Sequence, residues 1–236
     1  MLQILENYSL KNFNTFGIDV SARYFVEINH EDDLVELFMD PQWLQMERLI
    51  LGGGSNMLFV NDFDGLVIRM NIRGIEHRIN HEEVFVEAGA GEIWNDLVNF
   101  CVDREYAGIE NLSLIPGSVG ASPIQNIGAY GVELKDVFQS CRAFEITTGG
   151  FKTFSKEDCR FGYRDSVFKN ELKEKYIIVS VKFRLSLVPN INLKYGAIEQ
   201  ELANRHITTP GIKEVSQVIS HIRVSKLPDP STIGNA

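Results

Sequence analysis

The sequence predicts a mixed α/β fold in which strands run into glycine-rich turns. Strand and helix patterns alternate along the 236 residues, and 44% hydrophobic content with 23% charged residues is sufficient for a sizeable core. Glycine clusters at 52–56 and 89–91 each follow a predicted strand. A third glycine-rich stretch, 108–133, fits neither a helix nor a strand period. Because irregular segments of this length inside a domain are usually functional, we expect it to bind a ligand.

Residues 1–73 are expected to form a small α/β unit. Apolar runs predict strands at 23–28, 48–51, 58–60 and 65–70. Between the first two strands, Leu34, Leu37 and Phe38 would share one face of a helix over residues 31–39. This succession places the glycine cluster at 52–56 directly after the second strand.

Residues 74–210 are expected to form a second unit, and residues 211–236 the start of a third. Strands are predicted at 84–88, 137–146, 151–154 and 176–185, with a hairpin turn at 147–150. A helix is predicted over 93–105, because its apolar residues follow the helical period. The third unit begins with a helix on which Val215, Val218, Ile219 and Ile222 share a face.

Charge and composition exclude several classes of function. The net charge of -9 argues against nucleic acid or an anionic membrane surface as a partner. With no basic leader and no apolar run of 18 residues, a cytoplasmic protein without membrane insertion is expected. The three cysteines have no CxxC spacing, and His77 and His81 do not share a helix face, so no metal site is predicted. Phosphorylated ligands stay possible, since backbone amides bind phosphate whatever the net charge.

The glycine clusters leave two interpretations open. Residues 52–56 and residues 89–91 each fit either a phosphate-binding loop or a tight turn. Neither has the spacing of a dinucleotide fingerprint or the lysine of a P-loop. Together with 108–133 they favour a large nucleotide cofactor.

Cationic and phenolic side chains gather near three predicted turns. Tyr163 and Arg164 lie in the segment 159–166, where a guanidinium could hold an anionic substrate through two hydrogen bonds. The alternative is a structural ion pair of Arg160 or Arg164 with a nearby aspartate. The segments 194–196 and 223–230 have the same two interpretations, an anion site or solvated surface charge.

A set of motifs in fixed order carries a family resemblance. The motifs are Asn14-Thr15-Phe16-Gly17, Leu51-Gly52-Gly53-Gly54-Ser55-Asn56, Gly89-Ala90-Gly91-Glu92, Ile115-Pro116-Gly117-Ser118-Val119-Gly120, Pro123-Ile124-Gln125-Asn126-Ile127-Gly128-Ala129-Tyr130-Gly131, Cys159-Arg160-Phe161-Gly162-Tyr163-Arg164-Asp165-Ser166 and Lys226-Leu227-Pro228-Asp229-Pro230. The set resembles the UDP-N-acetylenolpyruvoylglucosamine reductases, flavoenzymes of peptidoglycan precursor synthesis, over residues 14–236. Lys194-Tyr195-Gly196 resembles the subtype with a substrate-covering tyrosine.

The resemblance implies an FAD-binding fold of the vanillyl-alcohol-oxidase type. Residues 1–73 and 74–210 would be two FAD-binding subdomains, and 211–236 would begin a substrate-binding domain. The residues implied in FAD binding are Gly52, Gly53, Gly54, Ser55, Asn56, Ile115, Pro116, Gly117, Ser118, Gly120, Ala121, Ser122, Ile124, Gln125, Asn126, Ile127, Gly128 and Ala129. Those implied in substrate binding are Tyr163, Tyr195, Arg223, Lys226 and Asn235, with Arg164 as the catalytic residue.

The implied reaction passes a hydride from NADPH through FAD to the enolpyruvyl double bond of UDP-N-acetylglucosamine enolpyruvate, in a monomer. An enolate forms beside a carboxylate, and a fixed cation such as Arg164 would stabilise it. In the family, Gly-Asn-Ala continues into Gly-Ser-Phe-Phe, and that serine is the proton donor. The sequence stops at Ala236, so we expect this chain to bind FAD without reducing the substrate at the native rate. The alternatives are an FAD-binding module without turnover, another oxidase of the same fold, and a nucleotide-regulated binding protein without flavin.

Overall fold

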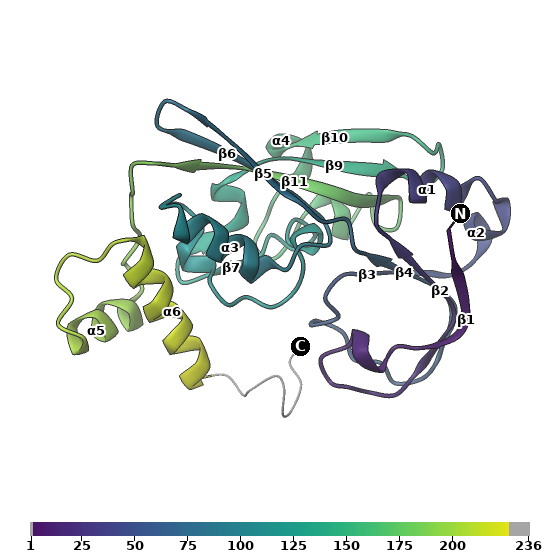
Figure 1. Ribbon diagram of the computed structural model, residues 1–236, viewed down its shortest axis with the longest axis horizontal. Coiled ribbons are helices and arrows are strands. Elements are labelled where there is room, and N and C mark those ends of the chain that lie inside the picture. Colours follow the sequence, from purple (N-terminus) through teal and green to yellow (C-terminus); the bar gives the residue numbers. More distant parts are fainter. Residues whose placement is uncertain (1, 227–236) are drawn as a thin grey trace.

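A computed structural model describes residues 2–226 as two large β-sheets with helices packed against them, and a small two-stranded pair (Figure 1). The first sheet has the strand order β1-β2-β4-β3 and the second the order β10-β9-β11-β6-β5. The strands of the first sheet are β1 Ile4–Ser9, β2 Ser21–Ile28, β3 Arg48–Leu51 and β4 Phe63–Met70. Those of the second are β5 Ile75–Asn80, β6 Glu83–Gly89, β9 Phe138–Glu145, β10 Phe151–Ser155 and β11 Tyr176–Ser186.

The first sheet is mixed, since β4 pairs in parallel with both β2 and β3 whereas β1 is antiparallel to β2. Helix α1, Glu31–Phe38, agrees with the predicted helix and buries Leu34, Leu37 and Phe38. The short helix α2, Pro41–Gln45, was not predicted; Asp40 caps it by accepting a hydrogen bond from the Gln42 amide.

One strand predicted for the first unit is wrong, and two edge strands, one in each unit, were not predicted. Residues 58–60 form no strand, and Leu58 and Val60 are largely exposed on an irregular loop. Strand β1 was not predicted, because its residues are only partly buried and show no regular alternation of apolar and polar side chains. Edge strand β5 escaped for the same reason, since five of its six residues are exposed.

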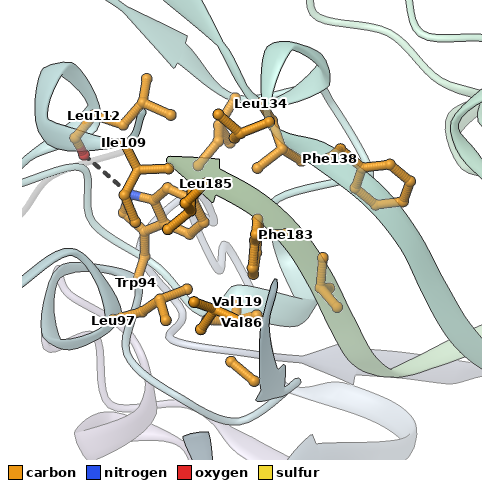
Figure 2. Packing of buried hydrophobic residues seen from close by; sticks show 14 of the residues in the cluster. Val86, Trp94, Leu97, Ile109, Leu112, Val119, Leu134, Phe138, Phe183 and Leu185 are labelled. Atoms are coloured by element: carbon orange, nitrogen blue, oxygen red, sulfur yellow. Dashed lines mark hydrogen bonds between the residues drawn. The ribbon is translucent and has the colours of Figure 1, made fainter. Parts of the chain in front are cut away.

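The second sheet is antiparallel throughout and covers the largest hydrophobic cluster. The predicted hairpin is present as β9 and β10, and helix α3, Trp94–Asp103, packs beneath the sheet (Figure 1). Trp94 is 1% exposed, and its indole Nε1 donates a 2.9 Å hydrogen bond to the Leu112 carbonyl (Figure 2). This bond attaches the glycine-rich stretch to the core.

The two sheets share a second hydrophobic cluster. Leu34 and Phe38 of α1 lie in one cluster with Phe144 of β9, whose ring stacks on Phe38 at 5.6 Å. Arg142 of β9 donates to both carboxylate oxygens of Glu31 at 3.0 Å. Packing and charge therefore fix the loops of one sheet relative to those of the other.

The stretch from Gly108 to Glu133 is irregular, as predicted. It contains short 3-10 turns and a small hairpin, whose two strands, β7 Gly128–Ala129 and β8 Val132–Glu133, have two residues each. After β10, helix α4, Lys156–Cys159, is capped by Ser155, whose Oγ accepts from the Asp158 amide.

The last two helices pack on each other, at the lower left of Figure 1. Helix α6, Ile212–Lys226, agrees with the predicted helix, and α5, Gly196–Asn204, was not predicted. Their shared cluster contains Ile198, Leu202, Val215 and Ile219, so α5 groups with α6 in its packing. The division at residue 211 stays a prediction.

No helix in residues 2–226 has the length and apolar character needed to cross a membrane. Within the same residues no cluster of three metal-ligating side chains is found, and the His77 ring lies against the rings of Phe100 and Tyr106. The cysteines are free and buried, and burial raises the pKa of the Cys101 thiol to about 12.

Candidate functional site

Two glycine-rich loops from different parts of the chain touch each other. The loop after β3 places Gly53 against Gly117, so that a Cβ on Gly53 would lie 3.2 Å from the Gly117 Cα. A Cβ on Gly52 would lie 2.3 Å from the Ser118 Oγ. Side chains at these positions would separate the loops, so glycine allows the two backbones to approach each other closely. The structure thus brings together two groups of predicted cofactor-binding residues.

The loop 117–120 is held in place by the segment 90–94. Gly117 O accepts a 3.0 Å bond from the Trp94 amide, and the Val119 and Gly120 amides donate to Glu92 and Ala90 carbonyls at 2.8 and 2.9 Å. The glycine cluster at 89–91 therefore supports its neighbour, and Gly91 packs on the Asn71 backbone. This packing is that of a structural turn.

The loop 52–56 has its own support, from Asn14. The Asn14 amide group donates to Leu10 O at 2.8 Å and Ile18 O at 3.0 Å, and its Oδ1 accepts from the Ile18 amide. The loop so formed lies against Gly54, whose φ of +63° and 2.0 Å approach of a would-be Cβ to Phe13 O require glycine. Sequence reasoning quoted Asn14 as part of a motif without assigning this role.

A cavity of about 310 Å³ opens between the two sheets beside these loops. Its walls are mostly apolar, and Gly52 and Ser118 line one part of it. Other lining residues include Ile50, Ala90, Gly120, Ala121, Ile124, Ile177 and Ile178. Arg48, Lys173 and Glu174 supply polar groups. Small-molecule sites commonly combine an apolar wall of this size with a few polar groups.

Three predicted cofactor residues have buried side chains with protein partners. Ser122 Oγ donates to the Val119 carbonyl at 2.7 Å, and Ile127 is 8% exposed. Asn126 is fully buried, donates to Gly162 O at 2.8 Å, and accepts from the Lys135 amide at 3.0 Å. Asn126 therefore joins the glycine-rich stretch to the turn that carries Tyr163 and Arg164.

That turn is closed by a 3.0 Å bond from the Gly162 amide to the Asp165 carbonyl. Arg164 has a φ of +53°, and its Nη2 donates to the Gly128 carbonyl. Among the described residues it forms no salt bridge; Arg160 pairs with Glu171, and the Asp165 carboxylate accepts from Asn170. The structural ion pairs weighed for Arg160 and Arg164 with nearby aspartates are thus not the ones formed.

Arg164 faces a second pocket, of about 730 Å³, lined by polar groups. Tyr163, Tyr195, Arg223 and Lys226 line it too, so the structure gathers these predicted substrate residues at one place. Tyr163 is 83% exposed. Residues 128–133, together with Lys135 and Asp136, complete the lining. Asn235 lies outside the described residues.

Tyr130 is a pocket residue that sequence reasoning did not assign. Its ring meets Tyr195 edge-on with centroids 5.2 Å apart. Burial raises the pKa of Tyr130, and burial lowers the pKa of Arg223, whose positive charge beside the phenol partly opposes the first shift. Arg223 Nε also donates to the Leu114 carbonyl at 3.2 Å. The sequence did offer a sign of this role, because Tyr130 is a phenol between Ala129 and Gly131 in the glycine-rich stretch.

Comparison with known proteins identifies the family. A model described as an FAD binding domain matches residues 22–153. The UDP-N-acetylenolpyruvoylglucosamine reductase of Amoebophilus asiaticus is 49% identical over 100% of this chain and 70% of its own length. That of Pseudomonas savastanoi pv. phaseolicola is 50% identical over 100% of this chain and 69% of its own. The chain belongs to the UDP-N-acetylenolpyruvoylglucosamine reductase family.

Solved structures agree on the fold. The UDP-N-acetylenolpyruvylglucosamine reductase of Thermus caldophilus superposes with a TM-score of 0.68 at 20% identity, covering 97% of this chain and 71% of that one. A cholesterol oxidase of Brevibacterium sterolicum superposes with a TM-score of 0.55 at 15% identity, covering 78% and 38%. With the family match, these likenesses confirm the predicted FAD-binding fold and FAD as cofactor.

Proposed function

We propose that the chain holds FAD between its two glycine loops and presents the enolpyruvyl group of UDP-N-acetylglucosamine enolpyruvate to it. The observation that carries this proposal is the backbone contact between Gly53 and Gly117 beside the inter-sheet cavity. The family's reaction is the NADPH-dependent reduction of that substrate in peptidoglycan precursor synthesis.

The residues present fit a dinucleotide. Glycine-rich loops allow a ligand close to the backbone, and their N–H groups are suited to a pyrophosphate. In the proposal, Gly52 to Asn56 and Ile115 to Ser118 hold the pyrophosphate, and the apolar cavity takes an aromatic end of the cofactor. Gly120 to Ser122 and Ile124 to Ala129 would form the wall toward the second pocket.

Arg164 is the proposed catalytic residue. When bound, FAD supplies the hydride transfer between NADPH and the substrate's double bond. Addition of hydride to the terminal carbon builds negative charge beside the substrate's carboxylate, and a cation fixed in advance stabilises that charge most. The bond from Arg164 to the Gly128 carbonyl supports the role, since it orients the guanidinium at the pocket wall.

The remaining pocket residues are proposed to bind the substrate. Arg223 and Lys226 would attract its diphosphate, and Tyr163 and Tyr195 would cover the sugar, because phenols combine an apolar face with a polar tip. Asn235 stays a prediction from the sequence.

A monomer in the cytoplasm is the proposed setting. Both loops and the second pocket are built from one copy of the chain, so the site needs no partner subunit. Three free, buried cysteines fit a reducing compartment.

Reconstitution with FAD tests the proposal in two stages. The FAD-loaded chain is expected to show the absorption of oxidised flavin and to lose it on anaerobic addition of NADPH. UDP-N-acetylglucosamine enolpyruvate is then expected to perturb the flavin spectrum of the oxidised chain. A chain that fails to retain FAD would refute the cofactor site, and a flavin spectrum insensitive to the UDP-sugar would refute the substrate pocket.

A further inference from the structure

One buried amide connects two loops that lie far apart in the sequence. Asn111 is 1% exposed, in the 3-10 turn Glu110–Leu112. Its Nδ2 donates to the Tyr130 carbonyl at 3.1 Å and to the Asn192 carbonyl at 2.9 Å. Asn192 in turn donates its own Nδ2 to the Gly131 carbonyl at 3.0 Å. The two asparagines therefore tie the turn at 130–131 to the loop at 192.

The hydrogen bonds of Asn111 determine the orientation of its side-chain amide. A side-chain amide carries two N–H donors, and both are used on backbone carbonyls. Rotating the amide would turn its oxygen toward those two carbonyl oxygens, so the orientation is determined. The Oδ1 is buried and has no partner among the described residues. An unpaired buried acceptor costs folding free energy. The side chain therefore contributes through the two hydrogen bonds that it donates.

Each loop held by Asn111 carries a tyrosine of the second pocket. Tyr130 has a left-handed backbone with φ of +49°, which an L residue with a bulky side chain adopts only when its surroundings hold it. Tyr195 follows Asn192 by three residues and meets the Tyr130 ring edge-on at 5.2 Å. The bonds of Asn111 thus hold the backbone of Tyr130 directly, and hold the loop that leads from Asn192 to Tyr195.

We infer that Asn111 is a positioning residue for the UDP-sugar pocket. It fixes the Tyr130–Tyr195 pair beside Arg223, so that the aromatic wall is in place before a ligand arrives. The identity of the ligand rests on the proposed function; the connection between the loops does not.

Hydrogen exchange followed by mass spectrometry tests the connection in the FAD-loaded chain. With Asn111→Ala, exchange in residues 128–135 and 190–196 is expected to accelerate together by roughly tenfold or more. Ser113→Ala is the matched control, because Ser113 is 1% exposed, lies two residues away and bonds Glu110 and Ser216 instead of the tyrosine loops. Unchanged exchange in both segments with Asn111→Ala would overturn the inference.

A milder variant keeps the test open if Asn111→Ala does not fold. Asn192→Ala removes the reciprocal bond to the Gly131 carbonyl and the bond that Asn192 Oδ1 accepts from the Lys194 amide, but keeps both bonds of Asn111. It is expected to accelerate exchange in the same two segments. Acceleration limited to residues around 192 would count against the inference.

Titration with UDP-N-acetylglucosamine enolpyruvate, followed by flavin absorbance, tests the consequence. Asn111→Ala is expected to raise the substrate Kd by roughly tenfold or more and to leave the FAD Kd within about twofold. Equal losses of both affinities would point to a general structural effect and refute the positioning role. If the unaltered chain ignores the UDP-sugar while the exchange result holds, the proposed function fails and the connection through Asn111 stands.

Discussion

Replacing Gly53 by alanine is expected to weaken FAD binding by separating the two glycine loops. The added Cβ would lie 3.2 Å from the Gly117 Cα and 3.4 Å from its carbonyl carbon, closer than comfortable contact. Both neighbours are backbone atoms, so no side chain can rotate away. Overpacking of this kind typically costs about 1–3 kcal/mol, which corresponds to a roughly 5- to 150-fold rise in the FAD Kd if binding needs the closed loops.

The assay is a fluorescence titration of FAD into the purified chain, with Gly150→Ala as the matched control. A Cβ on Gly150 meets only the Thr148 Oγ1 at 3.5 Å, and Gly150 lies in the turn between β9 and β10 and lines neither pocket. That control is expected to bind FAD with unchanged affinity. Equal affinity of Gly53→Ala and the unaltered chain would refute the loop geometry, and equal weakening by both alanines would show a nonspecific effect.

Three further predictions address the second pocket and the core. Arg164→Met is expected to raise the Kd of the UDP-sugar by roughly 10- to 100-fold in a flavin-absorbance titration, because charge-assisted hydrogen bonds to the substrate's carboxylate are lost; an unchanged Kd would contradict a contact between Arg164 and the bound substrate. The hydrogen bond from Lys135 lowers the pKa of Glu133, so its stabilisation is present above roughly pH 4.3 and is lost as pH falls through the lowered value. Glu133→Gln is therefore expected to flatten the decline of Tm in acid, and an identical decline would count against the pair. Trp94→Phe removes the donor to the buried Leu112 carbonyl and is expected to destabilise the chain by about 1–3 kcal/mol in urea unfolding, whereas a loss below about 0.5 kcal/mol would mean that the bond contributes little.

The sequence predicted the helices and strands whose apolar residues form a clear pattern. Helix α3 was found because its apolar residues share one buried face, and strand β11 because it is a long, mostly buried apolar run. Strands β1 and β5 were missed because none of their residues is fully buried, which leaves no regular apolar pattern to read. The apolar residues Leu58 and Val60 suggested a strand that has no neighbour to pair with.

For the site, residue types were predictable, but their hydrogen-bond roles were not. The glycine loops and the group around Arg164 follow from motifs, whereas contact between Gly53 and Gly117 depends on how two sheets pack. Asn126 looked like a cofactor ligand by position, yet its amide bonds to the protein at Gly162 and Lys135. Asn111 gave no signal at all, because its partners are backbone carbonyls 19 and 81 residues away.

The central claim is that the two glycine loops jointly hold FAD, and a crystal structure of the FAD-loaded chain tests it most directly. The account predicts pyrophosphate oxygens within hydrogen-bond distance of backbone amides in both residues 53–55 and 117–118. It also predicts one aromatic end of the cofactor in the cavity lined by Ile124 and Ile178. FAD bound elsewhere, or a pyrophosphate contacting only one of the two loops, would contradict the claim.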